Sequence, residues 1–273
     1  MIQLDLTLAL VMLAVVVLFA LAAILLRVLD GRGFLASVAV GYSIIVGGGL
    51  GWFIIVAVFF TLGVGFTLYK YEYKKRIGAA QEKGGARNWP NILANGGAAS
   101  IFALAELFSG GLLFAALFVG SMAAAASDTV STELGLLSKF KPRLLIRPRS
   151  PVPPGTSGGV TPLGFAGAFF ASLVIGVMAS LLGVLPGVLP PLAAALAGGF
   201  VGSVADSFYG ATIQRKGFCV VCGKPVENLT HCGGEPTRRT GGFPFVENNI
   251  VNLLGSVTGA LASLISILLL MGH

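Results

Sequence analysis

The sequence has few charged residues for its length. Only 11% of its 273 residues are Asp, Glu, Lys or Arg, whereas 55% are hydrophobic and the mean hydropathy is +0.90. Soluble domains carry about 25% charged residues. These values exclude an ordinary soluble domain and indicate a chain that lies largely within a lipid bilayer.

Charge is missing from every second connection between the apolar runs. The runs cover residues 4–26, 34–50, 52–69, 91–108, 111–127, 163–183, 188–205 and 249–271. Several have the length of about 17–23 residues that a helix needs to cross the hydrocarbon core. Lys and Arg occur only at 27–32, 70–87, 139–149 and 215–239. We therefore predict an all-α polytopic membrane protein with eight spans, both termini outside, and long basic loops in the cytoplasm.

The first apolar run has no basic segment before it, and Arg27 and Arg32 follow it. We interpret it as an integral helix and not as a cleaved signal peptide. The net charge of +7 is explained by this topology and by anionic lipid headgroups, so no nucleic-acid partner is expected. We expect one transmembrane catalytic domain over residues 1–273, with a small cytoplasmic insertion at 214–246.

Acidic residues are rare inside the apolar runs, which makes two aspartates informative. Asp128-Thr129 and Asp206-Ser207 each place an acid and a hydroxyl at the cytoplasmic end of a Gly/Ala-rich run. A buried carboxylate is costly unless it is hydrated, paired or bound to a metal. Asp at a helix end can also accept local hydrogen bonds. Because the two pairs are equivalent, we favour Mg²⁺ or phosphate chemistry, with Glu133 as a further ligand or a base.

Asparagines recur at the cytoplasmic ends of two other runs. Asn88, Asn91 and Asn95 have the spacing of one helix face, and Asn248, Asn249 and Asn252 begin the last run. Single intramembrane asparagines often connect helices. Two clusters at the depth of the aspartates predict a polar pocket at the inner leaflet.

The chain lacks a Walker A sequence, because no Gly-Lys-Ser/Thr follows at the required spacing. It has instead a basic segment that ends in Pro153-Pro-Gly-Thr-Ser-Gly-Gly159. Amides of a Gly-rich turn can bind phosphate oxygens, and neighbouring Arg can add charge-assisted hydrogen bonds. A mobile loop against lipid headgroups is the alternative.

Cysteine is scarce, with only three residues, and all of them lie in one segment. Cys219-x-x-Cys222 precedes His231-Cys232 by eight residues, which suits a structural Zn²⁺ site with three thiolates and one imidazole. A redox pair is the alternative, although a cytosolic location disfavours a structural disulfide.

These residues resemble known membrane enzymes. Asp206-Ser-Phe-Tyr-Gly210 with Arg215-Lys-Gly217 is similar to the ending of CTP-dependent polyprenol and dolichol kinases and phosphatidate cytidylyltransferases. From about residue 30 to the C-terminus the chain more closely resembles one multispan family. That family was long catalogued as a domain of unknown function and includes the plant phytyl-phosphate kinase of tocopherol synthesis. The blocks that carry this resemblance are Arg87…Leu93-Ala-Asn95-Gly-Gly97, Ser127-Asp-Thr129…Glu133, Pro153–Gly159 and the Cys/His segment.

The resemblance implies phosphorylation of an isoprenoid monophosphate to the diphosphate by CTP or another nucleoside triphosphate. Trp89-Pro-Asn91 departs from the family's first block, so the resemblance assigns no role to Asn91. The catalytic residues are then Asp128, Asp206, Glu133 and Arg87, and the two aspartates hold Mg²⁺ between the phosphates. The expected substrate-binding residues are Asn95, Thr129, Lys139, Arg147, Arg149, Thr156, Ser157, Gly158, Gly159, Ser207, Asn248 and Asn252.

Two other functions fit the same sequence. A cytidylyltransferase would use Mg²⁺ and CTP but form a CDP-lipid, and a transporter would use intramembrane polar residues as a substrate path. The polar groups gather near one membrane face, whereas transporter sites normally lie at the midplane. We therefore expect a lipid-phosphate kinase whose partners are a nucleoside triphosphate, an isoprenoid phosphate and the membrane lipids.

Overall fold

The structure is a bundle of long apolar helices. The computed structural model describes residues 6–223 and 225–272, apart from the side chains of residues 82 and 83. Within this part, eight helices are long and apolar enough to span a membrane, which confirms the predicted fold class. They are α1 (Leu6–Leu25), α2 (Gly31–Gly48), α3 (Leu50–Leu68), α5 (Trp89–Ser109), α6 (Leu112–Gly135), α7 (Pro162–Leu181), α8 (Leu189–Thr212) and α9 (Asn248–Met271). The first two residues of the predicted span 4–26 lie outside the described residues.

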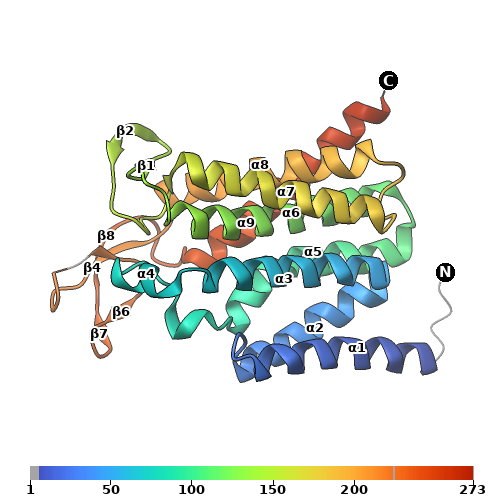
Figure 1. Ribbon diagram of the computed structural model, residues 1–273, viewed down its shortest axis with the longest axis horizontal. Coiled ribbons are helices and arrows are strands. Elements are labelled where there is room, and N and C mark those ends of the chain that lie inside the picture. Colours follow the sequence, from blue (N-terminus) through green and yellow to red (C-terminus); the bar gives the residue numbers. More distant parts are fainter. Residues whose placement is uncertain (1–5, 224, 273) are drawn as a thin grey trace.

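The long helices run along a common direction, with the two termini at one end and the strands at the other (Figure 1). Helix α6 is the most enclosed of the eight spans. Its many alanines allow close contact with its neighbours, and Phe118 stacks on Trp52 of α3 with ring centroids 4.2 Å apart. The core therefore forms around α6, the helix that carries Asp128.

Side-chain caps fix where three helices begin. Asp30 accepts a hydrogen bond from the Gly33 N–H (2.6 Å), and Asn88 accepts one from the Asn91 N–H (3.1 Å). Thr161 accepts one from the Gly164 N–H at 3.0 Å. A proline also lies in the first turn of α5 and of α7, where its missing N–H has no helical partner to lose.

Small residues bring α6, α8 and α9 into close contact beside the two aspartates. On α8 the glycines at 198 and 202 precede Asp206 at four-residue intervals, so all three share one helix face. A Cβ on Gly198 would lie 2.6 Å from the Cα of Gly120 on α6, and 2.8 Å from the Gly259 carbonyl oxygen on α9. Because backbones can approach this closely only without side chains, the glycine spacing sets the position of Asp206 against α6.

The short elements lie together at the end of the bundle opposite the termini (Figure 1). They include α4 (Tyr71–Arg76) and the 3₁₀ turn η1 (Glu82–Gly85). One sheet has the order β2-β1-β3, formed by Arg147–Pro151, Arg143–Leu144 and Gly159–Val160. A second has the order β5-β4-β8, formed by Pro225–Val226, Lys216–Phe218 and Arg238–Gly241, and β6 (Thr230–His231) pairs with β7 (Glu235–Pro236). All these pairings are antiparallel.

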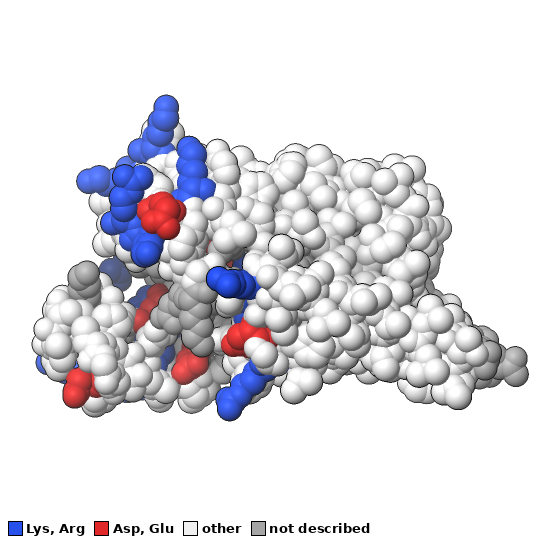
Figure 2. All heavy atoms as spheres, turned by 60° about the horizontal axis from the view of Figure 1, so that its bottom comes forward, with Lys and Arg blue, Asp and Glu red and all other residues white. Residues whose placement is uncertain are grey.

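Charged side chains gather at this same end, and the other described residues on the visible face are uncharged (Figure 2). The distribution agrees with the predicted segregation of Lys and Arg. Two helices differ from the sequence prediction: α6 and α8 run on to Gly135 and Thr212, well past the predicted ends at 127 and 205. The polar residues that follow each aspartate are compatible with helix, so Asp128 and Asp206 lie about two turns inside their helices.

Candidate functional site

Asp128 of α6 and Asp206 of α8 face each other at the loop end of the bundle. Their carboxyl groups lie within hydrogen-bonding reach of one another. Both line a narrow crevice between α5, α6, α8 and α9. Among the described residues, neither carboxylate has a Lys or Arg within ion-pair distance. Two neighbouring carboxyl groups without a cationic partner at this distance form an acidic centre that favours a divalent cation.

Amide and hydroxyl groups complete the crevice. Asn95 of α5 and Asn252 of α9 both line it. In the amide orientation that satisfies both neighbours, Asn252 donates to Asp206 Oδ2 (3.2 Å) and to the Asn248 carbonyl (3.0 Å). Ser256 also lines the crevice, and its buried Oγ has no hydrogen-bond partner among the described residues. A buried hydroxyl without a partner is costly, so this atom marks a place where a polar ligand would be stabilised.

Glu133 lies in a buried ion pair on the other side of α6. Lys74 Nζ of α4 is 2.6 Å from Glu133 Oε2, and the two side chains are 1% and 2% exposed. Thr67 Oγ1 donates to Glu133 Oε1 at 3.1 Å and accepts from Arg87 Nη2 at 3.1 Å. Glu133 therefore organises α3, α4 and α6, and connects through Thr67 to Arg87.

Arg87 lies where α2, α3 and α5 converge. Its backbone bonds to Val28 and Asp30 fix its position, at 2.9 and 3.1 Å. Burial lowers the pKa of Arg87, and the negative charges of Glu133 and Asp128 partly oppose that shift. An arginine stays protonated under all ordinary conditions, so Arg87 places a permanent positive charge in the field of Asp128.

The Gly-rich loop 153–159 lies against α8 and against Ala79, in the segment that follows α4. Gly158 has a φ of +77°, and a Cβ there would lie 2.7 Å from the Ser207 carbonyl oxygen and 2.5 Å from Ala211 Cβ. A Cβ on Gly155, with a φ of +83°, would meet Ala79 at 3.2 Å. Only glycine combines this backbone conformation with this closeness. The loop is thus a packed element one turn away from Asp206.

The remaining predicted residues are distributed around this centre. Thr129 faces Gly63 of α3, and Thr156 bonds to the Pro153 carbonyl within the loop. Asn88 is the N-cap of α5, and its side chain accepts a hydrogen bond from the Asn91 N–H. The described side chains of Lys139, Arg147, Arg149 and Asn248 are exposed, and none of them lines the crevice.

An apolar cavity adjoins the crevice. It lies between α1, α2, α3, α5 and α6. The space in it that a water-sized molecule can occupy is about 60 Å³, and the whole depression, with the part open to the surroundings, is about 730 Å³. Its walls are mainly apolar, with Phe53, Phe59 and Phe60 along α3, whereas Arg87 and Asn91 lie at one end. Asn95 lines both this cavity and the crevice of the aspartates. An elongated apolar space therefore ends beside a cation and an acidic pair.

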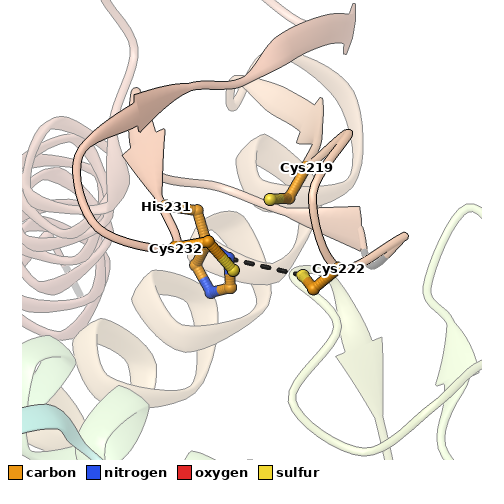
Figure 3. A group of neighbouring side chains, drawn as sticks. All are labelled: Cys219, Cys222, His231 and Cys232. Carbon is orange, nitrogen blue, oxygen red and sulfur yellow. Dashed lines mark hydrogen bonds between the residues drawn. The ribbon is translucent and has the colours of Figure 1, made fainter.

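The cysteines and a histidine form a separate cluster. The ligand atoms of Cys219, Cys222, His231 and Cys232 all lie within 4.8 Å of one another. Figure 3 shows the four side chains converging, with His231 Nδ1 3.5 Å from Cys222 Sγ. Backbone N–H groups, first that of Cys222, lower the pKa of Cys219 to about 6. The neighbouring thiols, first that of Cys222, raise the pKa of Cys232 to about 11.

Sequence reasoning gave no role to three residues that hold the site together. Lys74 is the buried partner of Glu133, but its position in the run Lys74-Lys-Arg76 indicated only a cytoplasmic loop. Glu227 binds the Gly-rich loop, and no motif marked it. Arg215 is 3% exposed and donates to the carbonyls of residues 227, 228 and 237. These hydrogen bonds hold the backbone of the last loop together.

Comparison with known proteins identifies relatives across most of the chain. No solved structure matches. Protein PGR of Arabidopsis thaliana is 30% identical over 82% of this chain and 90% of its own length. An uncharacterized membrane protein of Methanocaldococcus jannaschii is 34% identical over 70% of this chain and 77% of its own.

A more distant relative is the chloroplastic protein VTE6 of Arabidopsis thaliana, which is 24% identical over 78% of this chain and 57% of its own length. The family model described as integral membrane protein DUF92 matches residues 14–260. This match confirms the resemblance found in the sequence blocks around Arg87, Asp128 and Gly158. The chain is an integral membrane protein that belongs to the DUF92 family.

Proposed function

We propose that this protein transfers a phosphoryl group from a nucleoside triphosphate, such as CTP, to an isoprenoid monophosphate, at the cytoplasmic face of the membrane. One observation carries the proposal: Asn95 joins an acidic crevice to an elongated apolar cavity. A substrate with an anionic head and a hydrocarbon tail matches both parts at once. The family resemblance to the plant phytyl-phosphate kinase supports the same substrate class.

Asp128 and Asp206 would hold Mg²⁺. Their fit to that ion rests on two facing carboxyl groups that have no Lys or Arg within ion-pair distance among the described residues, and on the Ser256 hydroxyl, which has no hydrogen-bond partner in the same crevice. Bound Mg²⁺ neutralises phosphate charge during transfer. Asn252 orients Asp206 through its amide, and the glycine contacts among α6, α8 and α9 keep the two carboxylates together.

Arg87 is the cation best placed for the acceptor phosphate. It lies at the polar end of the apolar cavity and in the field of Asp128. The acceptor is already an anion, so the transfer needs no strong general base. Glu133, which is paired with Lys74, would organise Arg87 through Thr67 and would not remove a proton. The exposed Lys139, Arg147 and Arg149 would attract the nucleotide to this face.

The apolar cavity would hold the isoprenoid tail. From Gly63, near Arg87, to Phe53 it follows ten residues of α3, a length of about 15 Å at the rise of an α-helix. The tail would enter between helices and leave the phosphate at Arg87.

The direct experiment uses purified protein, Mg²⁺ and phytyl monophosphate with CTP labelled in either the γ or the α position. The proposal predicts γ-label in a lipid diphosphate and release of CDP. Label from the α position in the lipid would indicate a cytidylyltransferase. Movement of lipid across sealed vesicles without any labelled product would indicate a transporter. Either of these outcomes would refute the kinase proposal.

The tail position is tested by narrowing the cavity. Val56 and Val58 of α3 both pack against the main core, but only Val56 of the two lines the cavity. Val56→Phe should raise the KM for long isoprenoid phosphates more than for short ones. Val58→Phe, the matched control, should change KM equally for all lengths, if at all. If Val56→Phe raises the KM for long and short acceptors by the same factor, as expected of Val58→Phe, the tail assignment is wrong.

A further inference from the structure

The Cys/His cluster belongs to a segment that has little other means of staying folded. Residues 214–246 form only short strands, and Val220, Val221 and Leu229 are all more than half exposed. The side chains that this segment buries include the polar Gln214, Arg215 and Thr237. A small unit without an apolar core usually requires a metal or disulfides.

The local backbone points all four side chains to one place. The Gly223 N–H bonds to the Cys219 carbonyl at 2.9 Å, and Gly223 has a φ of +67°. This tight turn brings Cys219 and Cys222 together. Cys232 has a φ of +42°, and two glycines with positive φ follow it. This conformation lets the adjacent His231 and Cys232 face the same point (Figure 3).

The spacing of the side chains suits tetrahedral coordination. His231 Nδ1 lies 3.5 Å from Cys222 Sγ and 3.2 Å from Cys232 Sγ. Zn²⁺ bonds of about 2.3 Å to sulfur and 2.0–2.1 Å to nitrogen place such atoms about 3.5–3.8 Å apart. Small side-chain movements would therefore bring the four ligand atoms within bonding distance of one ion.

The segment between the two ligand pairs reaches the Gly-rich loop through Glu227. Its carboxylate accepts hydrogen bonds from Ser157 Oγ and from Gln214 Nε2, the latter at 2.8 Å. Its backbone carbonyl accepts from Arg215 at 3.1 Å. Ser157 precedes Gly158, which packs against α8 beside Ser207 and Ala211. A continuous set of contacts thus runs from the segment between the two ligand pairs to the helix of Asp206.

We propose that Cys219, Cys222, His231 and Cys232 bind one structural Zn²⁺, and that the metal-closed segment holds the Gly-rich loop on α8 through Glu227. Zinc binding and loop position are independent of the proposed phosphoryl transfer. The effect of the loop on catalysis rests on that function. A failed activity assay would therefore leave this inference intact.

Elemental analysis of the reduced protein and amide hydrogen exchange of residues 155–159 test the two parts. Wild type should contain one zinc per chain and protect the loop amides. Cys222→Ser should lose both the zinc and the protection. Glu227→Gln should keep the zinc but exchange the loop faster, whereas Glu235→Gln, an exposed glutamate of the same segment, should change neither.

If Cys222→Ser does not accumulate, removal of zinc from reduced wild type with a strong chelator gives the same comparison. Iron in place of zinc, or no stoichiometric metal, would overturn the metal assignment. Unchanged loop protection after zinc loss, or in Glu227→Gln, would overturn the connection to the loop.

Discussion

The ion pair between Lys74 and Glu133 gives the sharpest test of how the site is supported. Its Nζ–Oε2 distance is 2.6 Å and both side chains are buried. At an effective dielectric constant of about 20, two unit charges at this distance attract by about 6 kcal/mol. Desolvation opposes much of this attraction, and removal of one partner from a buried pair typically costs about 3–5 kcal/mol.

Lys74→Met should therefore lower the free energy of unfolding by about 3–5 kcal/mol, because it leaves the Glu133 carboxylate buried without a cation. Lys74→Met combined with Glu133→Leu should recover most of that loss. The control is Lys75→Met, since Lys75 is exposed and its removal should change stability by less than about 0.5 kcal/mol.

The assay is reversible unfolding of purified protein in mixed micelles, followed by turnover at saturating substrate. Recovery of both stability and turnover in the double variant would assign Glu133 a structural role. Recovery of stability without turnover would refute a purely structural role, because turnover would then need Glu133 itself, either to position Arg87 through Thr67 or in the chemistry. If Lys74→Met lowers the free energy of unfolding by no more than Lys75→Met does, the proposed contribution of the buried pair to stability is wrong.

Three further changes test the crevice and the loop. Asp128→Asn or Asp206→Asn should reduce turnover by about 10²-fold or more without unfolding the protein, and near-normal turnover at limiting Mg²⁺ would remove that residue from the metal site. Ser256→Ala should leave the free energy of unfolding unchanged or raise it, by up to about 1 kcal/mol, because it removes a buried hydroxyl without a partner. It should nevertheless raise the KM for a phosphate substrate, and an unchanged KM would exclude the hydroxyl from binding. Gly158→Val places a Cβ 2.5 Å from Ala211 Cβ at a φ of +77°. The resulting strain of about 1–3 kcal/mol should displace the loop and raise the KM for at least one substrate. Gly97→Val, at a position with open space, is the control.

The spans could be predicted from the sequence because apolar length and the distribution of Lys and Arg are set by the bilayer. The proximity of Asp128 and Asp206 also follows from their equivalent positions and from glycine spacing on α8. The positions of Asp128 and Asp206 within their helices were less predictable. Polar residues such as Thr132 and Ser207 continue a helix as readily as they begin a loop, so hydropathy placed the helix ends too early.

Contacts between distant segments could not be predicted from one sequence. Lys74 and Glu133 are 59 residues apart, and Ser157 and Glu227 are 70 residues apart. Each pair depends on how loops fold over the end of the bundle, and no local pattern records that arrangement. The Cys/His cluster is the exception, because ligand spacing along the chain carries its own geometric signal.

The central claim is most directly tested by transfer of label from [γ-³²P]CTP to phytyl monophosphate, with wild type and Asp206→Asn compared in the same Mg²⁺-containing detergent solution. The proposal predicts a labelled lipid diphosphate with wild type and little or none with the variant. No labelled lipid from wild type with any nucleoside triphosphate and any isoprenoid monophosphate, in protein shown to be folded, would contradict it.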